Sequence, residues 1–271
     1  MRDFTDKVVV ITGAGSGIGL ATARAFASEG SRVHLVDIDS QRVEEAARTT
    51  NRTESVAHVI DCTNPEEMNT LARDVLSREG RVDILHNNAG VCCGGPVESI
   101  SIEDWKWSLD VNLMAAVHGV KAFAPDMIRR KDGGHIINTA SMAGLLGLPF
   151  VTPYCASKFA MVGFSEALAA EMSVHGIGVT TVCPGAVRTR VFQDARIDLP
   201  GKWVDRIGQL IGRFGADPQQ VACDILQAVR SGRGLVFPGA GAMLPLFLLK
   251  RTSKPLYDRF NRALMLLTRV R

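Results

Sequence analysis

The feature of this sequence that most constrains its fold is a buried strand that runs into a glycine-rich turn and then a helix. Residues 8–19 read VVVITGAGSGIG, with glycine at positions 13, 15, 17 and 19. Glycine lets the backbone turn sharply and approach a bound group closely, and the next helix offers free N–H groups and the positive end of its dipole. This order predicts a β-α-β unit whose loop binds the pyrophosphate of a dinucleotide.

The rest of the chain alternates short β-branched runs with longer helical patterns. Several runs are apolar on successive residues, as expected for parallel strands covered on both faces. Strands are expected at 7–11, 32–36, 55–60, 82–85, 135–138, 179–182 and 235–237, and helices at 17–29, 39–49, 65–79, 102–130, 153–175 and 218–230. We therefore expect one α/β domain over residues 1–238, a Rossmann-type doubly wound parallel sheet of about seven strands in the order 3-2-1-4-5-6-7.

Charge and composition argue against several other classes. The 271 residues carry a formal net charge of +3, too small to indicate a nucleic-acid partner. The six cysteines and six histidines show no metal-ligand spacing, so we expect reduced thiols, a cytoplasmic chain and no metal site. No apolar signal segment opens the sequence, and the apolar stretch 240–249 is about half as long as a membrane span.

An acidic residue at the end of the second expected strand bears on which dinucleotide is bound. Asp37 lies 18 residues beyond Gly19 (37 − 19), where a carboxylate can bind the adenine-ribose hydroxyls and would repel a 2′-phosphate. This position favours NAD over NADP. Two alternatives stay open: Asp37 could belong to an ordinary solvated turn, or the loop could belong to a methyltransferase that binds S-adenosylmethionine. Such enzymes usually place an acidic residue before the first glycine, where this chain has Thr12.

A second motif places a tyrosine and a lysine one helical turn apart. Tyr154 and Lys158 are i and i+4 in a helix that we expect to begin with Thr152 as N-cap and Pro153 at the first helical position. A free phenol has a pKa of about 10, and bringing it to about 7 means stabilising the phenolate by roughly 4 kcal/mol. A nearby ammonium favours the phenolate, so the pair could transfer protons. The alternative is a partly exposed helix face without chemistry.

The sequence resembles the short-chain dehydrogenase/reductase family, of the standard-length NAD(P)-dependent type, from position 7 to about position 238. Each motif is weak alone, but together they occur in the family's order. Ser141, for example, precedes Tyr154 by 13 residues (154 − 141), the usual spacing in the family. The motifs are Thr12-Gly13-x-x-x-Gly17-x-Gly19, Asp37, Asp61, Asn87-Asn88-Ala89-Gly90, Asn112, Ser141, Tyr154-x-x-x-Lys158 and Pro184-Gly185.

The resemblance implies roles for four residues in an oxidoreductase that acts on CH–OH groups. Tyr154 would exchange a proton with the substrate oxygen as general acid/base, and Lys158 would lower its pKa and bind the nicotinamide ribose. Ser141 would bind the same substrate oxygen. Asn112 would anchor a water that relays protons from Lys158 to solvent. From the residues alone, Ser141 could equally be a cap or turn residue, and Asn112 a buried polar group bonded to the backbone.

The resemblance also implies a set of contacts with NAD(P). The backbone of the glycine loop would bind the pyrophosphate, residues after the third and fourth strands would border the adenosine, and residues 184–189 would border the nicotinamide. The loop lacks the basic residue that NADP-preferring relatives often carry, in agreement with Asp37. The expected contacts are Gly13, Ser16, Gly17, Ile18, Gly19, Asp37, Asp61, Cys62, Asn88, Ala89, Gly90, Tyr154, Lys158, Pro184, Gly185, Val187 and Thr189.

Three segments would form the substrate walls in this fold, and all three contain many apolar residues: 91–93, 142–150 and 189–214. The last is long and contains glycine, so we expect a mobile lid. The expected pocket takes a lipophilic secondary alcohol or ketone. The alternative is that these side chains only pack on the core. The pocket residues would include Cys92, Met142, Leu148, Phe150 and Phe192.

Residues 239–271 form an extension beyond the usual end of the family pattern. Its apolar positions recur at helical spacing and its polar positions are mostly basic, so we expect an amphipathic helix. Packing on the same domain or on a neighbouring subunit is favoured over contact with an anionic membrane surface. Homodimers or homotetramers through the two long helices are usual among similar proteins. The positions concerned are Leu256, Phe260, Leu264 and Leu267, with Lys250, Arg251, Lys254, Arg259, Arg262, Arg269 and Arg271.

Among the functions considered, the sequence favours an NAD-dependent enzyme that interconverts a secondary alcohol and a ketone by hydride transfer. Asp37 disfavours the close alternative, an NADPH-linked carbonyl or 3-oxoacyl reductase. A non-catalytic cofactor-binding scaffold of the same fold would usually have lost Tyr154 or Lys158, and both are present. An epimerase or dehydratase shares the tyrosine–lysine motif but normally carries a larger C-terminal substrate domain.

Overall fold

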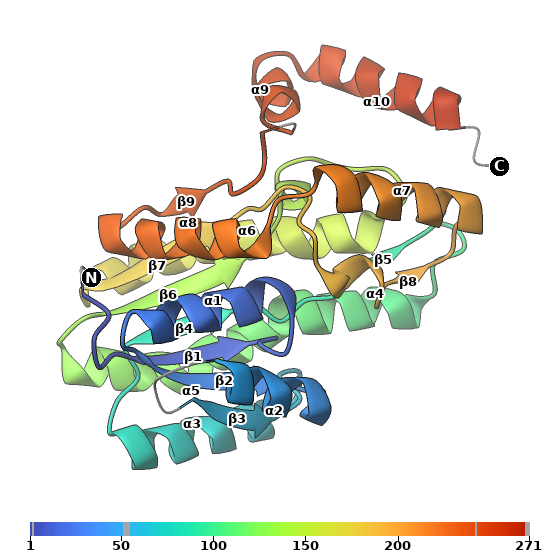
Figure 1. The fold of residues 1–271 in the computed structure, drawn as a ribbon. Helices are drawn as coiled ribbons and strands as arrows, with labels where there is room; N and C mark the ends of the chain where they lie inside the picture. The colour runs from blue at the N-terminus through green and yellow to red at the C-terminus, as the bar shows by residue number, and fades with distance from the viewer. Residues whose placement is uncertain (2, 51–54, 242, 269–271) are drawn as a thin grey trace.

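Parallel strands form the central sheet of the structure, a computed structural model that describes residues 1, 3–50, 55–241 and 243–268, without the side chains of 264–268. The seven strands have the order β3-β2-β1-β4-β6-β7-β9 (Figure 1). Counted over this sheet alone, that is the expected order 3-2-1-4-5-6-7, which is thereby confirmed. The strands are β1 (Val8–Thr12), β2 (Arg32–Asp37), β3 (Val56–Val59), β4 (Ile84–Asn87), β6 (Gly134–Thr139), β7 (Ile177–Val182) and β9 (Leu235–Val236).

Helices connect the strands and cover both faces of the sheet. A short second sheet pairs β5 (Cys93–Gly94) with β8 (Arg196–Ile197). The α-helices are α1 (Gly17–Ser28), α2 (Ser40–Thr49), α3 (Pro65–Glu79), α4 (Ile102–Leu109), α5 (Ala115–Arg130), α6 (Thr152–Ser173), α7 (Gly201–Phe214), α8 (Pro218–Ser231), α9 (Leu244–Thr252) and α10 (Lys254–Thr268). A π-helical turn spans Asp110–Met114, and 3-10 turns span Met142–Gly144 and Arg190–Phe192.

The strand β1 shows why the chain forms three layers. All its residues are buried, and successive side chains point to opposite faces of the sheet. Val9 and Ile11 pack in a core with apolar residues of α1, α2 and α8. Val8 and Val10 pack in a second core with residues of α3, α5 and α6. Full burial of such a side chain contributes about 1.5–3 kcal/mol, so a β1 that is apolar on both faces needs helices on both sides.

The carboxyl ends of the strands meet at one edge of the sheet. The chain leaves β1 and β4 in opposite directions along the sheet, because β2 and β3 lie on one side of β1 and β6, β7 and β9 lie on the other side of β4. In open parallel sheets, ligands bind in the crevice where the strand order reverses. The loops after β1, β2, β4, β6 and β7 all reach this crevice.

The segment expected as one helix over 102–130 contains a π-helical turn. Asn112 lies in this turn, between α4 and α5, and its side chain bonds the backbone of Val91 in a neighbouring loop. Such turns are frequent at functional positions, because an extra residue redirects the side chains around it. At the start of α6 the expected cap is wrong: the N-cap is Val151, and Thr152 is already helical.

The segment expected as a mobile lid over 189–214 contains a 3-10 turn, the strand β8 and the helix α7, and the helix was not foreseen. Trp203, Ile207, Leu210 and Phe214 recur at helical spacing within it. This helical spacing was the feature of the sequence that could have predicted the helix. It was outweighed by glycines at 201, 208 and 212, which lower helix propensity without excluding a helix.

The C-terminal helices pack on the segment that follows β6. Lys250 donates to the carbonyl oxygen of Leu145 (2.6 Å), and the hydroxyl of Tyr257 donates to the carbonyl oxygen of Gly147 (2.8 Å). Tyr257 is buried in a third apolar cluster with Met142 and Leu146. A division of the chain after Pro238 stays a prediction. The side chains of Leu264 and Leu267, and all of Arg269 and Arg271, lie outside the described residues.

Across the described ranges, no helix is both long enough and apolar enough to traverse a bilayer. Within those same ranges, no group of histidine, cysteine or acidic side chains is arranged to hold a metal ion.

Three buried histidines on central strands predict a loss of stability in mild acid. Burial lowers the pKa of His34 and His135 to about 4 and that of His86 to about 3, below the ordinary value of 6.5. The unfolded chain therefore binds protons at a pH where the folded chain does not. Stability should be complete above pH 6.5 and fall as the pH decreases towards 4, by at most about 3 kcal/mol for each histidine.

Urea unfolding at several pH values would test this. His135 bonds the hydroxyl of Thr180 (2.8 Å), a contact that glutamine can retain. The variant His135→Gln should therefore flatten the decline of the free energy of unfolding between pH 6.5 and 4. The matched variant His175→Gln, at an exposed histidine, should leave the slope unchanged. Equal slopes for all three proteins would contradict the assignment.

Candidate active site

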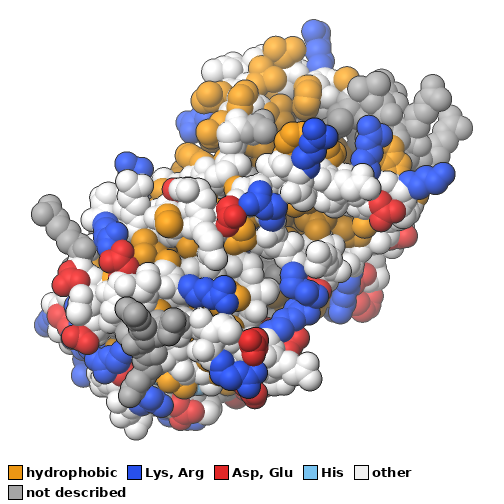
Figure 2. All heavy atoms as spheres, in the orientation of Figure 1, with side chains coloured by type: hydrophobic (Ala, Val, Ile, Leu, Met, Phe, Trp, Pro, Cys, Tyr) orange, Lys and Arg blue, Asp and Glu red, His pale blue; other side chains and the backbone are white. Residues whose placement is uncertain are grey.

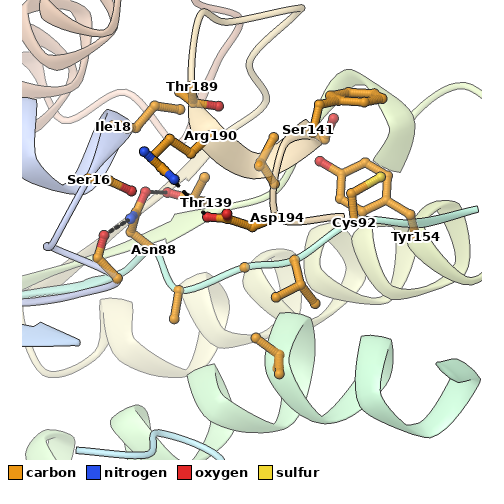
Figure 3. A pocket seen from close by; sticks show the side chains of 18 of the residues that line it. Ser16, Ile18, Asn88, Cys92, Thr139, Ser141, Tyr154, Thr189, Arg190 and Asp194 are labelled. Carbon is orange, nitrogen blue, oxygen red and sulfur yellow. Dashed lines mark hydrogen bonds and ion pairs between the residues drawn. The ribbon is translucent and has the colours of Figure 1, made fainter. Parts of the chain in front are cut away.

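A cavity of about 620 Å³ follows the carboxyl edge of the sheet. Figure 3 shows its two ends. Ser16, Ile18 and Asn88 lie at one end, and Ser141, Tyr154 and Cys92 lie at the other. The first end is built by the glycine loop and the ends of β2, β3 and β4. The second end is built by the segments after β4 and β6, the start of α6 and parts of 184–243.

The glycine loop is packed closely against the strand next to it. Gly13 has φ +62°, and a Cβ there would lie 2.8 Å from Cα of Ala89. A Cβ at Gly19 would overlap the carbonyl oxygen of Gly13, so any side chain would push α1 away from the loop. Gly19 therefore supports the loop from below and is not part of the cavity wall.

The N-terminus of α1 faces the cavity in a form suited to an anion. Among the described residues, no side chain caps it: Ser16 is at the N-cap position without a capping bond, and no acidic residue stands in the first turn. Ser16, Gly17 and Ile18 all line the cavity. The N–H groups and the positive dipole end are thus left for a bound phosphate. This arrangement fits a dinucleotide pyrophosphate.

Asp37 joins the loop to the second strand and faces the same end of the cavity. Its carboxylate accepts from the N–H of Gly15 (2.9 Å) and from that of Asp39 (3.1 Å). The sequence did not reveal that Arg42 and Asp194 also line this end, joined by an ion pair of 3.0 Å between α2 and the segment after β7. Arg42 also bonds Asp39 (3.0 Å), so two carboxylates neutralise its charge.

Asn88 acts as a connector as well as a wall. Its amide donates to the carbonyl oxygens of Thr12 (3.1 Å) and Gly13 (3.2 Å), and its Oδ1 accepts from Thr139 (3.3 Å). The hydroxyl of Thr12 in turn accepts from the N–H groups of Asn88 and Ala89. These bonds hold the ends of β1, β4 and β6 in register, because strand ladders no longer satisfy the backbone there.

At the other end, the side chains of Ser141 and Tyr154 point toward one another (Figure 3). Ser141 lies two residues after β6, where its hydroxyl accepts from the N–H of Ala143 (3.1 Å), so it is also the cap of a short 3-10 turn. Burial raises the pKa of Tyr154 above its ordinary value, and the hydrogen bond with Ser141 opposes that rise. In the protein alone, Tyr154 is therefore held as the neutral phenol.

Lys158 is held on the same side of α6 as Tyr154. Its Nζ lies 5.8 Å from the centroid of the Tyr154 ring and donates to the carbonyl oxygen of Thr139 (2.9 Å). Lys158 is only 3% exposed, and burial lowers its pKa to about 8. The bond to Thr139 uses one of three donors, so the ammonium can bind further acceptors in the cavity.

Asn112 lies behind the cavity wall. Its Oδ1 accepts from the N–H of Val91 (2.8 Å), and its amide donates to the carbonyl oxygen of Val91 (3.0 Å) and to Ser157 (3.0 Å). It thus ties three segments together: the π-helical turn, the loop after β4, and α6. The side chain of Asn112 is therefore a buried polar group bonded to the backbone, which is the alternative that the residues alone had left open.

Most of the expected site residues line this one cavity. Four do not: Gly19, Asn112, Met142 and Phe150. Met142 is fully buried in the third apolar cluster because its 3-10 turn points it inward. Phe150 has φ +63°, and its carbonyl oxygen accepts from the N–H of Gly95 (2.7 Å). The expected residues that line it are Gly13, Ser16, Gly17, Ile18, Asp37, Asp61, Cys62, Asn88, Ala89, Gly90, Cys92, Ser141, Leu148, Tyr154, Lys158, Pro184, Gly185, Val187, Thr189 and Phe192.

The walls around Tyr154 are apolar. Burial raises the pKa of the Cys92 thiol to about 12, so it stays neutral at ordinary pH. Sequence reasoning missed several members of this wall because they come from segments far away in the chain. Two of them lie four residues apart in the expected helix 102–130, and this helical spacing was the only local signal. These members are Trp107, Val111, Ile211 and Met243, next to the expected Leu148 and Phe192.

Comparison with known proteins places the chain among dehydrogenases. Residues 7–200 match the family described as short chain dehydrogenase. The chain is 36% identical over 251 residues to "Probable oxidoreductase EphD" of Mycobacterium tuberculosis, which covers 89% of this chain and 42% of that protein. It thus spans less than half the length of that relative.

Two further relatives are matched over most of their length. One is "Meso-2,3-butanediol dehydrogenase" of Serratia marcescens, 36% identical over 219 residues, with 81% of this chain and 85% of the relative covered. The other is "17-beta-hydroxysteroid dehydrogenase 13" of Mus musculus, 33% identical over 254 residues, with coverage of 92% and 79%.

A solved structure with a bound cofactor matches the fold closely. It is a short chain dehydrogenase/reductase from Burkholderia phymatum in complex with NAD, and it superposes with a TM-score of 0.88. The two chains are 33% identical, and the superposition covers 94% of this chain and 96% of the other.

Proposed function

The chain belongs to the short-chain dehydrogenase/reductase family, and we propose that it interconverts a lipophilic secondary alcohol and a ketone with NAD as cofactor. One observation carries the proposal. A proton-transfer pair, Tyr154 and Lys158, stands with Ser141 at one end of a cavity whose other end has an uncapped helix N-terminus and Asp37. A dinucleotide and a hydroxyl-bearing substrate can therefore occupy one continuous space.

Tyr154 would serve as the general acid/base. In the oxidative direction, Tyr154 in its phenolate form would accept the substrate O–H proton, while Ser141 bonds the same oxygen and fixes its position. Oxidised NAD, when bound, would supply the acceptor for the hydride of the carbinol carbon and a positive charge near the phenol. In the reductive direction the phenol returns its proton to the carbonyl oxygen. Only a carbon bearing both C–H and O–H can react in this way.

The cavity electrostatics explain why proton transfer would depend on the assembled complex. Burial alone holds Tyr154 neutral, and the cation at Lys158 is weakened because burial lowers its pKa to about 8. The added positive charge of an oxidised cofactor favours the phenolate. Asn112 would support this site from behind by fixing the Val91 backbone, and the proposed water relay would start from Lys158.

Asp37 supports NAD over NADP. Its carboxylate lies at the adenosine end and would repel a 2′-phosphate. Two cations of the described cavity wall, Arg42 and Arg190, could attract such a phosphate. Asp39 and Asp194 already bind Arg42, and Asp194 also pairs with Arg190. An NADPH-linked carbonyl or 3-oxoacyl reductase is therefore the second candidate, favoured only by these two arginines.

The apolar walls support a lipophilic substrate. Trp107, Leu148, Phe192 and Met243 surround the Tyr154 end. The two relatives matched over most of their length are named for a small diol and for hydroxysteroids, so kinship alone leaves the substrate open.

The proposal also covers the cellular compartment and the oligomeric state. All six cysteines, each of them within the described residues, are free, which supports a reducing compartment such as the cytoplasm. Exposed apolar side chains along the part of the chain from α4 to α6, Ile102 on α4, Met114 in the π-helical turn and Phe159 on α6, support a homodimer or homotetramer.

Removal of one hydroxyl tests the proton-transfer role. Tyr154→Phe should lower kcat by about 10²–10⁴-fold while the Kd for NAD, measured by calorimetry, stays nearly constant. Tyr257 is the other tyrosine of the chain and lies outside the cavity wall. Tyr257→Phe makes the same chemical change and should retain kcat. Full turnover by Tyr154→Phe would refute the mechanism.

The cofactor preference is tested by Asp37→Ser. Steady-state kinetics with both cofactors should give a ratio of kcat/KM for NAD over NADP that is at least about tenfold lower in the variant, a change of about 1.4 kcal/mol. Asp74→Ser, at an exposed carboxylate on α3, controls for net charge. An unchanged ratio, or a wild-type preference for NADP, would show that Asp37 does not select the cofactor.

A panel of secondary alcohols tests the substrate class. Each methylene added to an apolar substituent should raise kcat/KM by up to about fourfold until the cavity is filled. Leu148→Ser should weaken this gain and spare small diols. Faster turnover of polyols than of lipophilic alcohols would exclude the proposed class and leave the reaction itself standing.

A further inference from the structure

In Figure 1 the helices α9 and α10 lie above the rest of the molecule, and α7 lies below α10 in this view. Large apolar side chains on these helices are exposed to solvent. Figure 2 shows apolar and basic side chains gathered over this region. Each of the exposed side chains is between 47% and 71% accessible: Leu210 and Phe214 on α7, Leu248 on α9, and Leu256 and Phe260 on α10.

α7 has an apolar face that the rest of the chain does not fully cover. The whole helix is described, and none of its residues is buried. Its apolar side chains occupy one face, and only one side of that face is occupied: Ile211 lines the cavity, whereas Leu210 and Phe214 face solvent. A helix with a strong apolar face that is left half exposed is typical of a helix that docks on another surface.

Cations without carboxylate partners surround these apolar side chains. Some arginines elsewhere, such as Arg42, Arg130 and Arg196, bind nearby carboxylates. Lys254 is likewise paired with Asp258 (2.8 Å). Six exposed cations on the three helices have no ion pair among the described residues: Lys202, Arg206 and Arg213 on α7, Arg251 on α9, and Arg259 and Arg262 on α10.

Charge is also divided unevenly along the chain. Residues 239–271 contain seven cations and one acid, a net charge of 7 − 1 = +6, while the whole chain carries +3. Residues 1–238 therefore carry 3 − 6 = −3. An isologous contact of this face with a second copy would place the same free cations opposite one another, which is unfavourable. An anionic surface with an apolar layer beneath it matches both properties of the face.

We propose that the face formed by α7, α9 and α10 binds reversibly to the surface of an anionic lipid bilayer. Leu210, Phe214, Leu248, Leu256 and Phe260 would enter the boundary between headgroups and acyl chains, and the six free cations would contact the headgroups. The helices lie on the bilayer and do not cross it. Because Ile211 and Met243 also line the cavity, the mouth of the active site would open beside the lipid.

Co-sedimentation with vesicles tests this directly. The full chain should sediment with phosphatidylcholine vesicles that contain phosphatidylglycerol, and much less with phosphatidylcholine alone. Binding should weaken as NaCl is raised, because exposed charges are screened. Each cation removed should lower the partition coefficient by about fivefold. The measurement needs no substrate or cofactor, so its result is independent of the proposed reaction.

Two pairs of variants separate the charge and apolar contributions. Arg251→Glu with Arg259→Glu should abolish the preference for anionic vesicles, and Leu210→Ser with Phe260→Ser should weaken binding at every salt concentration. The charge control carries the same change at exposed sites elsewhere, Arg73→Glu with Arg233→Glu, and the apolar control replaces exposed valines by serine, Val59→Ser with Val174→Ser. The controls should bind like the wild type, and thermal unfolding should show that all variants remain folded.

Several outcomes would overturn the proposal. One is no sedimentation with anionic vesicles at low salt. Another is equal loss of binding in the control variants. A third is light scattering that shows the face variants dissociating an oligomer that the wild type forms without lipid, since the face would then be a subunit contact.

Discussion

The buried ammonium of Lys158 is the group on which the site depends. A charge removed from water is costly unless it is paired, and here its one described hydrogen-bond partner is the carbonyl oxygen of Thr139 at the end of β6. That bond joins α6 to the central sheet and fixes the lysine one turn below Tyr154. Moving either element would leave a charge buried without a partner, so the geometry of the Tyr154–Lys158 pair is coupled to the packing of the fold.

The edge of the sheet is held together by side chains because the strands end there. Thr12, Asn88 and Thr139 bond one another or their backbones across β1, β4 and β6. One layer away, Asn87 donates to Asn138 (2.8 Å), which donates to Ser165 on α6 (2.9 Å). Such a polar network positions loops accurately, since each backbone group that leaves a ladder must find a partner.

Segment 189–214 and the C-terminal helices lie outside this hydrogen-bond network. Segment 189–214 is attached to the body at its base, where β8 pairs with β5 and Arg196 stacks on Trp107 at 3.9 Å while bonding Asp104. Its helix α7 then stands over the cavity with no buried residue. The C-terminal helices reach the cavity wall through Met243 and hold the 145–147 backbone through Lys250 and Tyr257. One side of these helices therefore shapes the apolar pocket while the other faces solvent.

The sequence by itself determined the layers of the fold, the glycine loop and the tyrosine–lysine face, because each depends on residues that are close in the chain. Runs such as 8–12, the φ of Gly13 and the four-residue step from Tyr154 to Lys158 are local properties. Only the tertiary structure decided that Met142 and Phe150 turn away from the cavity, that Arg42 meets Asp194 across 152 positions, and that Trp107, Ile211 and Met243 complete the wall. These contacts join segments with no shared period, so they exist only after the strands have set the distances between them.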